Sequence, residues 1–312
     1  MLTVWMSGQV TPDQLAQVRA AAPGADVRHF ASQKALEAQI EDAEVVAGNL
    51  SPAALARAER LKWVQSWAAG PDALMYPEMR ASDILCTSCK SNGAIPLAEH
   101  AIMLMLMLNR DALRWHRAQE AHRWEHRPHG ELNGLTCGII GLGYSGQDLA
   151  LKCKAFHMRT LGLRRTPVPT PNIDELFTHD RLHELLAQSD FVVVTAPRTP
   201  ETVGMLGEAE FRAMKPTAHY ICFSRGGIAD DAALLRALQE GWIAGGGLDA
   251  HDQEPLPPNS PFWTLPNAIV TPHNGATTPQ TRQRGIDIFV ENLRRYQTGQ
   301  ELVNVIDKAA GY

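Results

Sequence analysis

The sequence predicts an α/β protein with two parallel sheets, in which one domain is inserted in the other. Short apolar runs alternate with helical patterns along the 312 residues, which is typical of parallel strands flanked by helices. Two longer helical patterns, Ile95 to about Arg117 and Thr277–Gln297, flank the second series of runs. The chain is therefore expected to leave a first domain, build a second one and return to the first.

The first series of elements occupies the N-terminal third of the chain. Apolar runs predict strands at Leu2–Met6, Val45–Ala47 and Trp63–Trp67. Helices are expected to begin at Thr11-Pro12 and Ser51-Pro52, because Thr and Ser cap helices and proline suits the first helical position. The opening MLTVWMSGQV lacks a basic segment and a small-residue cleavage site, so it is interpreted as a strand and not as a secretion signal.

One long helix is expected from Ile95 to about Arg117. Its apolar run, Ala101–Leu108, is much shorter than the ~20 residues that cross a bilayer, so we predict a buried helix and no membrane span. A polar loop follows at Trp124–Asn133, and the final helix precedes a short closing segment at Leu302–Ile306. The second series predicts strands at Cys137–Ile140, Arg159–Leu163, Phe191–Thr195, His219–Phe223, Ile243–Leu248 and Ala268–Val270.

Composition and charge exclude several classes of protein. The 29 basic and 34 acidic residues give a net charge of −5 with neutral histidines, which argues against a nucleic-acid binder that relies on net positive charge. Five cysteines are an odd number for a disulfide framework. Together with the missing secretion signal, this favours a cytoplasmic protein that has neither nucleic acid nor a membrane as its partner.

A glycine-rich turn, Gly141-Leu142-Gly143-Tyr144-Ser145-Gly146, lies between an apolar run and a helical pattern. That context is the one a dinucleotide fingerprint requires: Gly141 permits the turn, Gly143 lets the backbone approach the pyrophosphate, and Gly146 lets helix and strand pack closely. The phosphates then face a helix N-terminus. We therefore expect two Rossmann-like or flavodoxin-like parallel-sheet domains. They are a Rossmann, NAD(P)-binding domain at 96–282 and the substrate domain at 1–95 and 283–312, in which it is inserted.

The end of the next strand indicates which dinucleotide is bound. Arg159–Leu163 runs into Arg164-Arg165-Thr166, and no acidic residue lies between Leu161 and Thr166. An acidic residue at this place usually holds the ribose 2′-hydroxyl of NAD, whereas arginines bind the 2′-phosphate of NADP. Arg164 and Arg165 thus predict a preference for NADP, with NAD as the second choice. The alternative is that both are solvated surface charges.

Three further segments place polar residues where a predicted strand ends. They are Ser224-Arg225-Gly226-Gly227, the stretch from Asp249 to Glu254, and Thr271-Pro272-His273-Asn274-Gly275. Ligands of open α/β sheets bind outside the carboxyl ends of the strands, so these residues are expected at the site. Taken singly, each of them is more often an ordinary loop or strand-end residue.

Four stretches of the sequence resemble one known family. They are IPLAEHAIMLML, GLTCGIIGLGYSG, FSRGGIADDAALLRAL and GGGLDAHDQEPLPPNSPFWTLPNAIVTPHNGATT. In their order and spacing, these stretches resemble the D-isomer-specific 2-hydroxyacid dehydrogenases over nearly the whole chain. Within that family, the pair Arg164-Arg165 makes the chain most similar to the glyoxylate/hydroxypyruvate reductase branch. The chain departs from the family pattern at Tyr144-Ser145, where Arg-Ile is frequent, and at Asn274-Gly275, where small apolar residues are commoner.

The resemblance implies hydride transfer from NADPH to C2 of a small 2-oxo acid, such as glyoxylate or hydroxypyruvate, which gives the D-2-hydroxy acid. It assigns His273 as the acid/base, Glu254 as its partner and Arg225 as the group that binds the substrate carboxylate. Histidine suits proton transfer because its ordinary pKa is about 6.5. The backbone of Ala69 and Gly70 is expected to contact the substrate, and a homodimer without a metal is implied. Further cofactor contacts are expected at Tyr144, Ser145, Thr195, Ala196, Pro197, Phe223, Ser224 and Asp249.

Other interpretations stay open from the sequence. The substrate of such an enzyme could be phosphoglycerate or a longer 2-oxo acid, and the same fold serves non-enzymatic, dinucleotide-sensing corepressors. His122–His126 fits the H-x-x-E-H zinc pattern, although a proline and a glycine soon follow and leave little room for the helix of such a site. The stretch Trp124–His129 could instead reach a partner's active site. Cys86–Cys89 lacks the second pair of a zinc site, and Trp67 is expected in the core.

Overall fold

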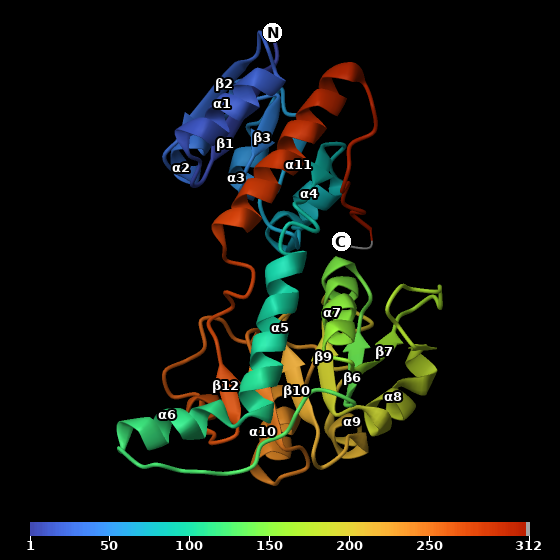
Figure 1. The fold of residues 1–312 in the computed structure, drawn as a ribbon. Coiled ribbons are helices and arrows are strands. Elements are labelled where there is room, and N and C mark those ends of the chain that lie inside the picture. The colour runs from blue at the N-terminus through green and yellow to red at the C-terminus, as the bar shows by residue number, and fades with distance from the viewer. Residues whose placement is uncertain (310–312) are drawn as a thin grey trace. The chain divides into compact units, whose positions relative to one another are not determined.

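The computed structural model describes residues 1–309, which form two compact units (Figure 1). Unit 1 contains Met1–Gly93 and residues 278–309, and unit 2 contains Ala94–Thr277. Each unit has its own parallel sheet with helices packed on it. The prediction of two parallel-sheet α/β domains is therefore confirmed.

Unit 1 is built on a five-stranded sheet in the order β2-β1-β3-β4-β5, and all its strand pairs are parallel. This is the strand order of the flavodoxin-type fold. The strands are β1 (Thr3–Ser7), β2 (Asp26–Phe30), β3 (Val45–Ala47), β4 (Trp63–Gln65) and β5 (Leu85–Thr87). The helices are α1 (Pro12–Ala21), α2 (Gln33–Glu37), α3 (Pro52–Leu55), α4 (Pro77–Ala81) and α11 (Pro279–Thr298), with 3-10 turns at Ile40–Asp42 and Asp72–Leu74.

Side-chain caps explain where the helices of unit 1 begin. Thr11 Oγ1 accepts the backbone N–H of Gln14 at the start of α1, and Ser51 Oγ accepts that of Ala54 at the start of α3. Each cap satisfies an amide that the helix itself leaves unpaired. Both helix starts are as expected from the Thr-Pro and Ser-Pro pairs.

Two details of unit 1 differ from the sequence prediction. The apolar pattern does not reveal β2, because DVRHF is an edge strand with a single buried residue. The strand expected at Trp63–Trp67 ends at Gln65. The closing segment Leu302–Ile306 was expected only as a short segment, and it makes one isolated bridge, from Val305 to Thr87. At the margin of a sheet, a short apolar run thus indicates buried side chains and does not give the bounds of a strand.

Unit 2 is built on a seven-stranded parallel sheet in the order β12-β11-β10-β9-β6-β7-β8. The strands are β6 (Thr136–Ile140), β7 (Arg159–Leu163), β8 (Glu175–Phe177), β9 (Phe191–Val194), β10 (His219–Cys222), β11 (Gly245–Leu248) and β12 (Ala268–Val270). The helices are α5 (Ala94–Asn109), α6 (Ala112–Glu120), α7 (Tyr144–Ala155), α8 (Leu182–Gln188), α9 (Glu208–Ala213) and α10 (Asp231–Gln239), with 3-10 turns at His179–Arg181 and Pro261–Thr264.

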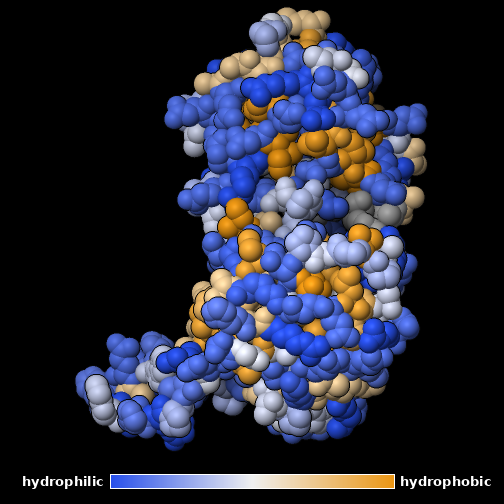
Figure 2. Space-filling model, turned by 45° about the vertical axis from the view of Figure 1, so that its right-hand side comes forward, coloured by the Kyte–Doolittle hydropathy of each residue, from blue (hydrophilic) through white to orange (hydrophobic). Residues whose placement is uncertain are grey.

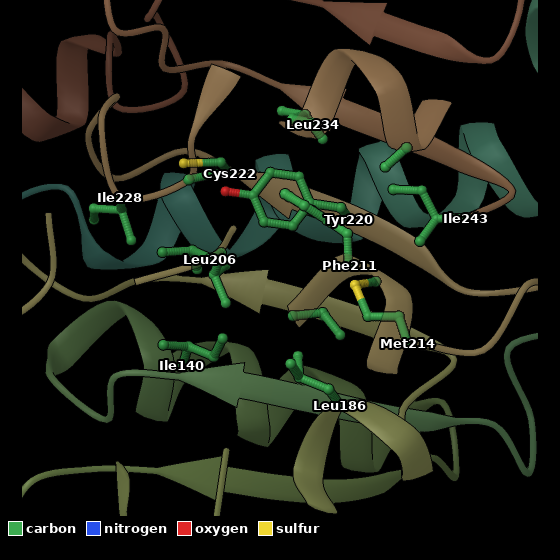
Figure 3. Close-up of a cluster of buried hydrophobic side chains, with 14 of the residues drawn as sticks. Ile140, Leu186, Leu206, Phe211, Met214, Tyr220, Cys222, Ile228, Leu234 and Ile243 are labelled. Carbon is green, nitrogen blue, oxygen red and sulfur yellow. The ribbon is translucent and has the colours of Figure 1, made fainter. Parts of the chain in front are cut away.

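The strands of unit 2 supply two cores, because successive side chains of a strand point to opposite faces. Ile139 packs in the core with α5 and α7, whereas Ile140 packs in the core with α8, α9 and α10. Figure 3 shows the second of these cores, in which Tyr220 lies edge-on to Phe211 with ring centroids 5.5 Å apart. Both faces of the parallel sheet are thus covered, as such a sheet requires.

The strand order of unit 2 reverses between β6 and β9, which are neighbours in the sheet although β7 and β8 separate them in sequence. Open α/β sheets bind their ligands at this kind of position, outside the carboxyl ends of the strands. The glycine-rich turn follows β6 directly. The topology therefore places the predicted fingerprint at the binding edge of the sheet.

The prediction of a single long helix from Ile95 to about Arg117 is wrong, because α5 ends at Asn109 and α6 begins only at Ala112. Asp111 breaks the helix with a φ of +54°, a left-handed conformation that Asp tolerates better than most residues. Helix α6 extends away from the sheet of unit 2 (Figure 1), and the projecting part at the lower left of Figure 2 is mostly hydrophilic. Within residues 1–309, no helix combines the length and the apolar character that crossing a bilayer needs.

Candidate active site

Two glycines of the turn after β6 are required by close packing. Gly141 has a φ of +101°, and a Cβ on it would lie 2.7 Å from the backbone nitrogen of Ala196. A Cβ on Gly146 would lie 2.2 Å from the carbonyl oxygen of Gly141. Both positions exclude any side chain, so the turn can close against β9 and α7 only with glycine.

The third glycine of the turn faces open space. A Cβ on Gly143 would meet no atom within 4 Å, and Gly143 is the residue that caps α7. Tyr144 and Ser145 are the first residues of this helix, and the first amides of a helix have no partner within it. A cradle of this kind fits the pyrophosphate of a dinucleotide, since the helix N-terminus attracts negative charge.

The loop after β9 is tied to the same turn. Thr195 Oγ1 donates to the carbonyl oxygen of Gly141 at 2.5 Å, and Ala196 is the residue against which Gly141 packs. The carbonyl oxygen of Pro197 accepts the hydroxyl of Thr202 at 2.8 Å. The structure thus brings Thr195 and Ala196 beside the glycine turn, where the sequence predicts cofactor contacts.

The two arginines directly follow Leu163 of β7, whose backbone oxygen accepts the N–H of Gly141 in the glycine turn at 2.9 Å. Arg164 is partly buried and donates from Nη1 to Thr170 Oγ1 at 3.1 Å. Arg165 is exposed and lies 3.7 Å from the carboxylate of Glu201. Two guanidinium groups therefore stand where an NAD-specific site would carry an acidic side chain. The choice between NADP and NAD remains a prediction.

His273 and Glu254, which are 19 residues apart in sequence, form a hydrogen bond of 2.7 Å between Nδ1 and Oε2. The other carboxylate oxygen of Glu254 accepts the backbone N–H of His251 at 2.9 Å. An ionised carboxylate only accepts hydrogen bonds, so Nδ1 of His273 is the donor and Nε2 is left to exchange a proton. Both side chains are about one-third exposed, which leaves this nitrogen within reach of a ligand.

Asp249 holds the loop on which His273 lies. Its side chain is fully buried, and Oδ1 accepts the hydroxyl of Thr271 at 2.6 Å and the backbone N–H of Asn274 at 3.0 Å. Oδ2 accepts the N–H of Gly275 at 2.9 Å. These hydrogen bonds fix the loop before and after His273, whose φ is +49°. A contact between Asp249 and the dinucleotide remains a prediction.

Arg225 follows β10 in the same unit as His273. Its Nη1 donates to the backbone oxygen of Ser224 at 2.7 Å, and the preceding Phe223 is buried in the core. Phe223 therefore has only its backbone to offer a ligand. Gly226 packs against the backbone of His251, since a Cβ on it would lie 2.1 Å from the carbonyl carbon of His251. The N–H of His251 in turn donates to Glu254.

The predicted substrate loop belongs to unit 1. Ala69 and Gly70 lie in an irregular segment directly after β4, where Ala69 is exposed. The neighbouring Trp67 donates from Nε1 to the carbonyl oxygen of Ser7 at 2.8 Å and stands edge-on to Phe289. Trp67 is thus part of the packing of unit 1, as expected.

The segments that resembled metal or redox sites have other contacts. Residues 123–130 form no helix, and Glu125 of the H-x-x-E-H pattern pairs with Arg114 at 2.7 Å. Cys86 and Cys89 are buried free thiols, and burial raises the pKa of both, that of Cys89 to about 12. Among residues 1–309, no three His, Cys, Asp or Glu side chains are grouped so as to hold a metal ion.

One residue that contributes to the site was not expected from the sequence. His100 on α5 contacts Thr271 and Asp249. His100 stands at the edge of the apolar run of α5, where a polar residue is easily taken for a solvent-facing boundary. No local sequence signal distinguishes His100 from the other polar residues that border the apolar run of α5.

Comparison with known proteins connects this geometry to a family. A family model described as the NAD binding domain of D-isomer specific 2-hydroxyacid dehydrogenases matches residues 102–275. A glyoxylate reductase from Pyrococcus furiosus is 32% identical over 260 residues, which cover 80% of this chain and 77% of that protein.

Two solved structures share the fold over the full length of the chain. A D-isomer specific 2-hydroxyacid dehydrogenase from Xanthobacter autotrophicus, in complex with NADPH and MES, has a TM-score of 0.88 at 30% identity and covers 100% of this chain and 99% of its own. An NADPH-dependent glyoxylate/hydroxypyruvate reductase from Sinorhizobium meliloti, in complex with NADP and sulfate, has a TM-score of 0.87 at 28% identity and covers 100% of both chains. The chain therefore belongs to the D-isomer specific 2-hydroxyacid dehydrogenases and is an NAD(P)-binding oxidoreductase of that family.

Proposed function

We propose that this protein reduces a small 2-oxo acid, such as glyoxylate or hydroxypyruvate, to the D-2-hydroxy acid with NADPH as the reductant. The hydrogen bond of 2.7 Å between His273 and Glu254 carries this proposal, because it leaves one imidazole nitrogen ready to donate a proton. The similarity to a glyoxylate reductase and to an NADPH-dependent glyoxylate/hydroxypyruvate reductase supports the choice of substrate class.

The dinucleotide would be held by residues 96–282, through the turn from Gly141 to Gly146 and the first amides of α7. Thr195 and Ala196 would border it, and Asp249 would approach its nicotinamide end. Arg164 and Arg165 would bind the 2′-phosphate through parallel hydrogen bonds, which favours NADP over NAD. When bound, the dinucleotide supplies the hydride for C2 of the substrate.

The side chains of this chain perform the remaining tasks. Arg225 binds and orients the substrate carboxylate through its planar fork of N–H donors. His273 donates a proton from Nε2 to the carbonyl oxygen as C2 receives the hydride, so the carbonyl becomes an alcohol. Glu254 stabilises the imidazolium before this transfer and keeps Nδ1 protonated after it. Residues 1–95 and 283–312 would add the backbone of Ala69 and Gly70 to the substrate site.

We further propose that the protein is a homodimer in which the segment after α6 meets the second copy. Trp124 lies on this segment and is 97% exposed. Tryptophan is among the residues most enriched at the energetic centre of interfaces, because it buries a large area with few rotatable bonds. We therefore propose that the side chain of Trp124 is buried against the second copy in the dimer.

The test is the loss of nicotinamide absorbance with NADPH and NADH run side by side. The substrates are glyoxylate, hydroxypyruvate, pyruvate, 3-phosphohydroxypyruvate and longer 2-oxo acids. We expect the highest kcat/KM with NADPH and a two- or three-carbon acid. Fastest turnover with the phosphorylated or a longer acid would contradict the proposed substrate, and tight NADPH binding without any turnover would favour a dinucleotide-sensing protein.

A further inference from the structure

We infer that His100, on α5, is a positioning residue that holds the loop carrying His273. The inference rests on the proposed reduction, in which His273 donates the proton, and His100 takes no part in that transfer. The side chain of His100 is 11% exposed, so it lies inside unit 2 and not on its surface. Its partners lie about 150 to 170 residues further along the chain, at the carboxyl ends of β11 and β12.

The hydrogen bonds of His100 follow from the number of protons available. Its Nε2 lies 3.1 Å from Thr271 Oγ1 and 3.6 Å from Asp249 Oδ1. The hydroxyl of Thr271 donates its single proton to Asp249, over 2.6 Å. Thr271 can therefore only accept from His100, and Nε2 of His100 must carry a proton. The imidazole thus donates to the hydroxyl of Thr271, and that hydroxyl donates in turn to the buried carboxylate of Asp249.

The same imidazole also packs against the backbone of the loop. A Cβ on Gly275 would lie 3.1 Å from His100 Cγ and 2.9 Å from Asp249 Oδ2. Asp249 meanwhile accepts the amides of Asn274 and Gly275. The loop is therefore held by its hydrogen bonds to Asp249 and by contact with the ring of His100.

A firm hold matters because His273 has a left-handed backbone, with a φ of +49°. Such a conformation costs free energy for a residue with a Cβ and persists where the surroundings support it. Loss of the His100 hydrogen bond would loosen the loop and misalign His273 with Glu254. The arginines and the glycine turn would be untouched, so proton transfer should suffer while binding is kept.

The experiment compares His100→Leu, which removes the donor, with His100→Gln, whose amide nitrogen can donate in its place. Thr271→Val removes the hydroxyl at nearly unchanged shape and serves as a second variant if His100→Leu folds poorly. The control is His219→Leu, since His219 is also a partly buried histidine of unit 2 but begins β10 and so lies at the opposite end of the sheet. The readouts are kcat, the KM for NADPH and for the 2-oxo acid, and the hydrogen exchange of the amides of Asn274 and Gly275.

In His100→Leu and in Thr271→Val we expect kcat to fall by about 10- to 100-fold, the range that a small displacement of a reacting group produces. KM should change little, and the two amides should exchange faster. His100→Gln should remain close to the wild type, and His219→Leu should alter neither kcat nor the two amides.

Unchanged kcat in His100→Leu and Thr271→Val would overturn the inference, whether or not amide exchange accelerates. If the wild-type protein reduces no 2-oxo acid, the proposed function fails separately and amide exchange alone decides. Faster exchange in His100→Leu with normal exchange in His100→Gln then supports the hold on the loop, and equal exchange in both overturns it.

Discussion

At the residue scale, the chemistry depends on the pair His273 and Glu254. His273→Gln keeps a polar side chain of similar reach that cannot be protonated at neutral pH. We expect kcat to fall by about 10²–10⁴, the usual contribution of general acid catalysis, with an unchanged Kd for NADPH measured by fluorescence titration. Glu254→Gln should lose less, because its amide oxygen can still accept from Nδ1. A His273→Gln protein with the kcat of the wild type would contradict the assignment.

Cofactor choice is a second property of single residues. Arg164→Asp places a carboxylate where a 2′-phosphate would bind, and like charges repel. We expect the ratio of kcat/KM for NADPH to that for NADH to fall by at least about tenfold, or about 1.4 kcal/mol. Arg159→Asp is the matched control, since Arg159 begins the strand β7 that Arg164 follows. An unaltered ratio in Arg164→Asp would refute the argument for NADP.

His219 links stability to pH. Burial lowers its pKa to about 4, against about 6.5 in the unfolded chain, and its ring stacks on Phe191. Between these values the unfolded chain binds more protons, so the free energy of unfolding falls as the pH drops from about 6.5 towards 4. At pH 5 the loss amounts to about 2 kcal/mol. Urea denaturation at pH 7.5 and 5.0 should show this loss in the wild type and not in His219→Leu.

Sequence reasoning reaches some of these residues and misses others for a physical reason. Glu254 and His273 each follow a strand of one sheet, so their meeting can be expected from topology. His100 meets Thr271 across 171 residues, and nothing local marks it, because a single histidine beside an apolar run has many equivalent explanations. The buried position of Asp249 is equally hidden in the sequence, since no local pattern shows that Thr271, Asn274 and Gly275 donate to its carboxylate.

At the element scale, two glycines of the turn after β6 have different roles: Gly146 is required for packing, and Gly143 is proposed to contact the cofactor. Gly146→Ala would place a Cβ 2.2 Å from the carbonyl oxygen of Gly141, whereas Gly143→Ala would place one in open space. We expect Gly146→Ala to lower the free energy of unfolding by about 1–3 kcal/mol, as overpacking does, and to weaken NADPH binding. Gly143→Ala should keep its melting temperature and still bind NADPH less tightly. Calorimetry and fluorescence titration check both; normal binding by Gly143→Ala would show that no phosphate lies there.

Elements with a buried face are predictable, and elements at margins are not. The strand at Phe191–Val194 is buried along its whole length and is found to within one residue. The edge strand β2 escapes notice because its pattern is mostly polar. The break between α5 and α6 is missed because Asp111 is an ordinary helix-surface residue in sequence and reveals its left-handed backbone only in the structure.

At the scale of the whole molecule, the segment after α6 predicts self-association. Trp124→Ala should weaken the proposed dimer by at least about 2 kcal/mol, or roughly thirtyfold in dissociation constant, if Trp124 is an interface anchor. Sedimentation velocity over a range of concentrations measures this. Trp263→Ala is the control, because Trp263 is also surface-exposed, at 49%, and should leave the association unchanged. A wild-type protein that stays monomeric at all concentrations would refute the dimer.

The two-domain architecture is predictable from sequence because alternating strands and helices constrain the topology strongly. The substrate is not predictable in the same way, because family and fold specify the chemistry and leave the identity of the acid to small differences in a binding pocket. Function at this scale must therefore be measured on the whole protein.

The most direct measurement follows a labelled hydride into the product. The protein is given hydroxypyruvate and NADPH that carries deuterium at the transferring position, and the glycerate formed is analysed by mass spectrometry and chiral chromatography. The account predicts deuterium at C2 of D-glycerate. Glycerate of the L configuration would contradict it. So would glycerate that lacks deuterium at C2 both with NADPH labelled on one face of the nicotinamide and with NADPH labelled on the other.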